Sequence, residues 1–132
     1  MSKSYDNTIP IFMEGKPRKK RIMAIETDAT PVEDPKNPDT CNLYQIFQHF
    51  APEERVEEVL VLYKGGGAAY GTLKKELVGY LLDYFGEARE KRARLIKDPG
   101  HVRDVLAMGA DKARSISQET IDLVRRNVGV TY

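Results

Sequence analysis

The chain has 132 residues, of which 41% are hydrophobic and 31% are charged, and its formal net charge is +1. This length suits one domain with at most a short appendage; the single cysteine excludes an internal disulfide framework, and no apolar run is long enough to span a membrane. The polar N-terminus is unlike a signal peptide, so the cytoplasm is the expected compartment, and a near-neutral charge confines any RNA-binding surface to local clusters.

The first forty residues predict an irregular segment with one short helix. They contain five of the seven prolines and little sustained periodicity. The helix is expected over residues 18–25, because Pro17 already has the φ angle of a first helical turn. Pro31 ends it, since the residue before a proline is disfavoured in the helical region. Residues 30–39 are then expected to be an ordered connector.

Two helices are predicted next, on either side of Pro52. Asp39 or Thr40 can cap a helix that continues to residue 50. Pro52, followed by two glutamates, is a strong start signal for a second helix, because the acids lie at the positive end of the helix dipole. This helix ends at the three glycines of residues 65–67.

The rest of the chain predicts two long helices. The first covers residues 72–97, where Gly79 and Gly86 each lower helix propensity by roughly 1 kcal/mol relative to alanine and favour a kink. The second begins after Asp98-Pro99 and ends at Gly129. Because strand hairpins and repeats are absent, the fold class expected is all-α, an antiparallel helical bundle with an irregular N-terminal loop segment.

Several residues that could carry chemistry have simpler interpretations. The glycine run follows a helix rather than a strand, so it predicts a turn, with Tyr70 packing inward, and not a phosphate-binding loop. His49 is expected at a helix end and His101 on the surface, and neither has metal ligands at suitable spacing. Cys41 is interpreted as a core or boundary residue. No metal site is predicted.

Two basic clusters stand out, at residues 16–21 and 89–94. The simplest interpretation of each is a solvated helix face, because charge runs are weak signals. A nuclear-import or DNA-binding patch is the alternative for the first cluster. The short predicted helix explains that cluster adequately, since its alternation with Ile22 and Met23 suits a half-buried element.

The N-terminal Ser2-Lys3-Ser4, followed by Tyr5-Asp6-Asn7, can wrap a polyphosphate. The lysine ammonium neutralises charge while hydroxyls and backbone N–H groups donate to phosphate oxygens. Together with Met1, this run resembles the second signature of class I aminoacyl-tRNA synthetases, Lys-Met-Ser-Lys-Ser, in the form seen in the tryptophanyl family.

The resemblance continues in order along the chain. The further segments that resemble the family are Lys20-Arg21-Ile22-Met23 with Thr27-Asp28, the proline-spaced residues 35–43, the glycine turn and helix start of residues 66–77, and residues 88–92, 98–99 and 105–110. Each segment alone is weak, but their common register favours membership of the family.

The resemblance implies a role in protein biosynthesis. The family's enzymes activate tryptophan with ATP and Mg²⁺ and transfer the acyl group to tRNA(Trp). Lys3 would stabilise charge on the phosphates, with Ser2 and Ser4 as loop partners. The division expected is a signature-loop remnant at 1–15, a short helix and connector at 16–39, and a tRNA anticodon-binding domain at 40–132. Within that domain the phosphate-contact candidates are Arg89, Lys91, Arg92 and Arg94.

The departures from the family pattern indicate a C-terminal part of such an enzyme. The lysine that opens the signature is absent, as are the nucleotide-binding sheet, the first class I signature and the tryptophan pocket. Ala68-Ala69 replaces an aliphatic residue and glycine, which changes only the turn. We therefore expect the chain alone to bind neither tryptophan nor ATP, to form no adenylate, and to be monomeric, although the family's enzymes are homodimers. A freestanding helical module that binds tRNA or a protein is the alternative.

Overall fold

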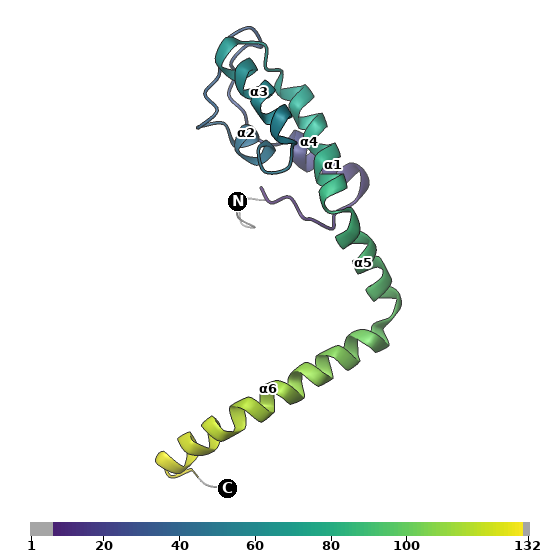
Figure 1. Cartoon of the computed structure of the whole chain (residues 1–132), viewed down its shortest axis with the longest axis vertical. Helices are drawn as coiled ribbons and strands as arrows, with labels where there is room; N and C mark the ends of the chain where they lie inside the picture. Colours follow the sequence, from purple (N-terminus) through teal and green to yellow (C-terminus); the bar gives the residue numbers. More distant parts are fainter. Residues whose placement is uncertain (1–6, 131–132) are drawn as a thin grey trace. The chain divides into compact units, whose positions relative to one another are not determined.

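A computed structural model describes residues 7–130, and every regular element within them is an α-helix (Figure 1). The helices are α1 (Gly15–Met23), α2 (Asn42–Phe47), α3 (Glu53–Gly65), α4 (Tyr70–Tyr84), α5 (Gly86–Lys97) and α6 (Pro99–Asn127). The predicted all-helical class is confirmed. The chain divides into two compact units, with the boundary between Arg89 and Glu90 inside α5. The first unit carries α1–α4, and the second carries most of α5 and all of α6.

Some helix ends differ from those expected. α2 is shorter than predicted, because neither Asp39 nor Thr40 caps it: the N-cap is Cys41, without a side-chain hydrogen bond. The backbone N–H of Asp39 instead donates to the Asn37 side chain at 2.9 Å, which forms a local turn. The long helix expected over 72–97 is divided at Phe85, beside one of the two glycines at which a kink was expected.

The core of the first unit is formed by buried apolar side chains from all four of its helices, with Ile22 alone from α1. α4 packs against both α1 and α2 (Figure 1). Each fully buried large side chain contributes roughly 1.5–3 kcal/mol through removal from water. The largest fully buried side chains are Ile22, Leu43, Phe47, Val59, Tyr63 and Leu77.

Two buried lysines hold backbone carbonyls in this unit. Lys74 Nζ donates to the carbonyls of Met23, at 3.2 Å, and Ile25, at 2.6 Å, at the C-terminal end of α1. A cation at this end of a helix is favoured by the helix dipole. Lys36 Nζ donates to the carbonyls of Pro31 and Asp34 and thereby closes the connector on itself. The lysines are satisfied by carbonyl oxygens, which explains how they tolerate burial.

The glycine turn between α3 and α4 is docked on the connector. Gly66 has φ +89°, and a Cβ atom there would lie 2.1 Å from the Glu33 carbonyl oxygen. The N–H of Gly67 donates to the Val32 carbonyl at 2.6 Å. Tyr70, at the start of α4, is half-buried, and its hydroxyl donates to the Asp28 carboxylate at 2.8 Å. The run is a structural turn, as predicted.

The second unit has an amphipathic helix without a core. Asp98 caps α6 by accepting from the His101 N–H at 3.0 Å. The apolar residues of α6 recur at spacings of three and four, yet none of its residues is buried. Across residues 7–130, no helix is both long and apolar enough to cross a membrane.

Candidate nucleic-acid interface

The predicted signature-loop residues Ser2, Lys3 and Ser4 lie outside the described residues. The segment that follows them borders a hollow of about 590 Å³ in the first unit. The hollow is lined by that segment, the end of α1 with the residues after it, and α2: Asn7, Thr8, Ile9, Arg21, Ala24, Ile25, Glu26, Asn42, Gln45 and Ile46.

The lining of this hollow is mixed and partly fixed by hydrogen bonds. The Gln45 amide donates to the Pro38 carbonyl at 3.1 Å and accepts from the Gln48 amide at 2.9 Å. Both the N–H donor and the oxygen acceptor of the Gln45 amide therefore have partners within the chain. Among residues 7–130, no three His, Cys, Asp or Glu side chains are grouped as a metal site.

Arg89, one of the four predicted phosphate contacts, is engaged inside the first unit. Its guanidinium donates to the carbonyls of Leu81, at 3.4 Å, and Leu82. These carbonyls belong to the last turn of α4, where the Phe85 N–H also donates to the Leu81 carbonyl at 3.4 Å. Arg89 is half-buried. Its hydrogen bonds thus stabilise the break between α4 and α5, a role that the charge pattern alone did not reveal.

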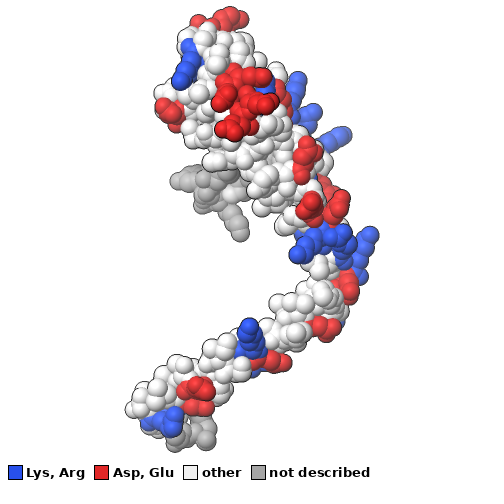
Figure 2. Space-filling view, in the orientation of Figure 1, with Lys and Arg blue, Asp and Glu red and all other residues white. Residues whose placement is uncertain are grey.

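The other three predicted contacts are exposed on α5, and Figure 2 shows the basic side chains gathered over that helix. Lys91 and Arg94 are three residues apart and share one side of the helix. Arg92 lies three residues after Arg89 and belongs to a different side. The structure therefore places the four residues around α5 rather than on one face.

The other basic cluster, at residues 16–21, forms most of α1. The helix has five basic residues and no acidic residue. Its inner side carries Arg18 and Ile22, which are buried, while Lys16, Lys19 and Lys20 are exposed. Arg18 Nη1 donates to the Met13 carbonyl at 3.2 Å. The predicted half-buried helix is confirmed, although the cluster splits into one inward arginine and an outward lysine face.

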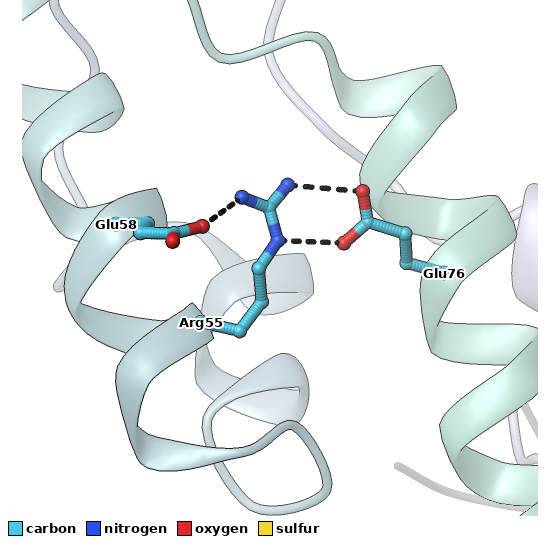
Figure 3. A network of polar contacts seen from close by, with 3 residues as sticks. All are labelled: Arg55, Glu58 and Glu76. Atoms are coloured by element: carbon cyan, nitrogen blue, oxygen red, sulfur yellow. Dashed lines mark hydrogen bonds and ion pairs between the residues drawn. The ribbon is translucent and has the colours of Figure 1, made fainter.

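The outer surface of α3 has the opposite charge. Glu53, Glu54, Glu57 and Glu58 are all exposed, and Figure 2 shows acidic side chains gathered over this helix. Arg55 bridges Glu58, at 2.6 Å, and Glu76 of α4, at 3.0 Å (Figure 3). The hydrogen bonds that Arg55 donates to Glu76, and then the one to Glu58, raise the pKa of Arg55 further above its ordinary value. The first unit thus segregates charge locally, with bases on α1 and acids on α3.

The remaining candidate side chains have structural surroundings. His49 and His101 are exposed. Cys41 is buried, with its Sγ 3.4 Å from the Tyr63 hydroxyl. Burial, followed by the contact with Cys41, raises the pKa of Tyr63 well above its ordinary value. This pair is part of the core and offers no exposed nucleophile.

Comparison with known proteins gives a consistent result. No family model matches the chain. It is 45% identical over 130 residues to a tryptophan–tRNA ligase of Rhodopirellula baltica and 42% identical to one of Campylobacter jejuni; each match covers 98% of this chain and 41% of the relative. The chain thus spans about two fifths of the length of these relatives. A crystal structure of the Campylobacter jejuni tryptophanyl-tRNA synthetase with ADP and tryptophan matches with a TM-score of 0.85 and 43% identity, over 98% of this chain and 40% of that one.

Proposed function

Because the chain belongs to the tryptophan–tRNA ligase family, we propose that it provides that enzyme's tRNA-binding helices and the end of its ATP-signature loop. The observation that carries the proposal is the match to a solved synthetase, at TM-score 0.85 and 43% identity along 98% of the chain. Identity at this level extends through the helices of both units, so the likeness is not limited to a single motif.

In this proposal the helices receive the tRNA and the loop serves the ATP chemistry. Residues 40–132 correspond to the anticodon-binding domain, in which the exposed Lys91, Arg92 and Arg94 position the RNA by contacting phosphates rather than bases. The Lys3 ammonium would stabilise negative charge on the ATP phosphates, with Ser2 and Ser4 as hydroxyl donors. ATP, when bound with Mg²⁺, supplies the phosphoanhydride that activates tryptophan.

The same proposal assigns the synthesis of tryptophanyl-adenylate to the whole enzyme. The chain spans about two fifths of its relatives. We expect a polypeptide of these 132 residues, purified by itself, to catalyse no ATP–pyrophosphate exchange. Exchange above background by the purified chain, with a full-length relative as positive control, would contradict this expectation.

A titration tests the RNA-binding part of the proposal. Fluorescently labelled tRNA(Trp) and a non-cognate tRNA are each titrated with the purified chain at two salt concentrations, because phosphate contacts make the affinity depend strongly on salt. Tighter binding of tRNA(Trp) at both concentrations is the expected result. Equal affinity for the two RNAs would replace the proposal with a general RNA-binding module.

A further inference from the structure

We propose that the outer face of α1, formed by Lys16, Lys19 and Lys20, is a contact surface for the phosphate backbone of RNA. The inference rests on the proposed function, since it takes the RNA partner from there, but it assigns the contact to residues different from the four candidates around α5. It follows from the geometry of α1, from its anchoring and from the distribution of charge over the first unit.

The three lysines share one face of the helix. Their spacings of three and four residues place them side by side, within about 6 Å along the helix axis. All three are exposed, and none forms an ion pair with another residue in the described range 7–130. α1 itself has no acidic residue that could neutralise them. Three unneutralised cations so close together attract a polyanion.

The lysine face is presented by a firmly anchored helix. Ile22 is fully buried on the opposite side, and the Lys74 ammonium holds the carbonyls at the end of the helix. Arg18, also on the inner side, bonds to the Met13 carbonyl. None of these contacts involves the outward lysines. Their replacement therefore removes charge without removing a contact that folds the unit.

The surroundings of α1 favour an RNA backbone over other anionic partners. A membrane-surface helix needs a broad apolar face beside its cations, whereas the large apolar side chains of α1 are only Ile22, which is buried, and Met23, which is 36% exposed. Exposed glutamates cover α3 in the same unit and repel phosphates there. Arg89 is occupied by carbonyls of α4. Among the described residues of the first unit, the α1 face is thus where three exposed lysines lie next to one another, whereas the exposed Lys64 and Lys75 lie singly on α3 and α4.

The test compares two variants with the same change in net charge. The first carries Lys16→Gln, Lys19→Gln and Lys20→Gln. The control carries Lys64→Gln, Lys97→Gln and Lys112→Gln, which are exposed lysines on three other helices. Circular dichroism first confirms that both variants are folded. Dissociation constants are then measured for tRNA(Trp) and a non-cognate tRNA between 50 and 200 mM salt, and for anionic phospholipid vesicles.

We expect the α1 variant to lose affinity for both tRNAs by the same factor, roughly tenfold or more. The slope of log affinity against log salt should fall by about 2 to 3, because each lost phosphate contact lowers it by roughly 0.7–0.9. The control should change much less, and neither protein should bind vesicles. Equal losses in both variants, no loss in the α1 variant, or vesicle binding without RNA binding would overturn the inference.

These results separate the inference from the function on which it rests. If the wild-type chain prefers tRNA(Trp) and the α1 variant binds it equally well, the inference fails and the proposed function stands. If the wild-type chain binds both tRNAs alike and the α1 variant loses both, the phosphate surface stands and recognition of tRNA(Trp) by this chain fails.

Discussion

At Gly66 the backbone conformation and the available space both demand glycine. The residue has φ +89°, and a Cβ atom would meet the carbonyl oxygen of Glu33. Gly79 is the opposite case, because it lies inside α4 with no atom within 4 Å of an added Cβ. The sequence places Gly66 in a turn and Gly79 inside a helix, and the surroundings of each show that glycine is needed only at Gly66.

Substitution of these two glycines by alanine should have effects of opposite sign. Gly66→Ala should destabilise the first unit by about 2 kcal/mol or more, because of the positive φ and the collision with backbone. Gly79→Ala should stabilise it by about 0.5–1 kcal/mol through helix propensity. Urea unfolding followed by circular dichroism measures both. A stable Gly66→Ala protein would show that the connector is not docked on the turn.

The second residue-scale prediction concerns Asp28, whose pKa is lowered from 3.8 mainly by the hydrogen bond from Tyr70 and then by those from Thr30. A carboxyl group with a lowered folded-state pKa contributes stability that is present above its unfolded pKa. That contribution is lost as the pH falls through the lowered value. Tyr70→Phe should therefore raise the Asp28 pKa toward 3.8, as measured by NMR titration of its carboxyl carbon. Tyr80→Phe is the control, and an equal shift in both variants would contradict the assignment.

At the scale of elements, α3 and α4 are tied together at one point by a planar ion pair. The Arg55 guanidinium donates through Nε and Nη2 to the two oxygens of Glu76, both at 3.0 Å, and the two side chains are 29% and 27% exposed (Figure 3). Such a bidentate pair is stronger and more directional than a single contact. The pair with Glu58, on the same helix, is a single contact at 2.6 Å whose carboxylate side chain is 63% exposed, so solvent screens it more strongly.

Replacing Glu76 and Glu58 one at a time should show how much stability comes from the link between α3 and α4 and how much from the pair within α3. Glu76→Gln should cost about 1 kcal/mol of unfolding free energy, because it breaks a half-buried link between helices. Glu58→Gln should cost less than about 0.5 kcal/mol, as is usual for an exposed pair within one helix. Thermal and urea unfolding of the two variants provide the comparison. Equal costs would mean that the interhelical link adds nothing to stability.

At the scale of the whole molecule, the two units differ in what stabilises them. The first unit has a continuous apolar core, whereas no residue of α5 or α6 is buried. α6 nevertheless carries large exposed apolar side chains, including Leu106, Ile116 and Val124. Most helical stability in proteins comes from the packing of an apolar face, so a helix with no buried residue depends largely on its own helix propensity.

Hydrogen exchange should reveal this difference in the purified chain. Amides of α2, α3 and α4 should exchange only through global unfolding, while those of α6 should exchange many times faster. Mass spectrometry of peptides after brief labelling resolves the two units. Strong protection of α6 would show instead that its apolar face is covered in solution, and Leu106→Ser would then remove that protection.

The sequence by itself determined the helical class, the positions of most helices and the family. Proline, glycine and capping signals are local, and the apolar spacings are regular, so residues such as Pro52, Asp98 and Gly129 predicted helix ends correctly. The resemblance to the synthetase family could be found from the order of the residues alone. The prediction that Asp39 or Thr40 caps α2 was wrong, because Asp39 forms a local turn with Asn37 instead.

Only the tertiary structure decided what the charged residues do. Arg89 and Lys74 bind carbonyls that lie seven residues or more away in the sequence, and Lys36 binds carbonyls of the connector to which it belongs. The charge pattern of residues 16–21 does not tell the buried Arg18 from the exposed lysines of α1. A charge pattern records which groups are present, but its meaning depends on which of them the fold buries, pairs or leaves to solvent, because desolvation and partners set the energy of a charge.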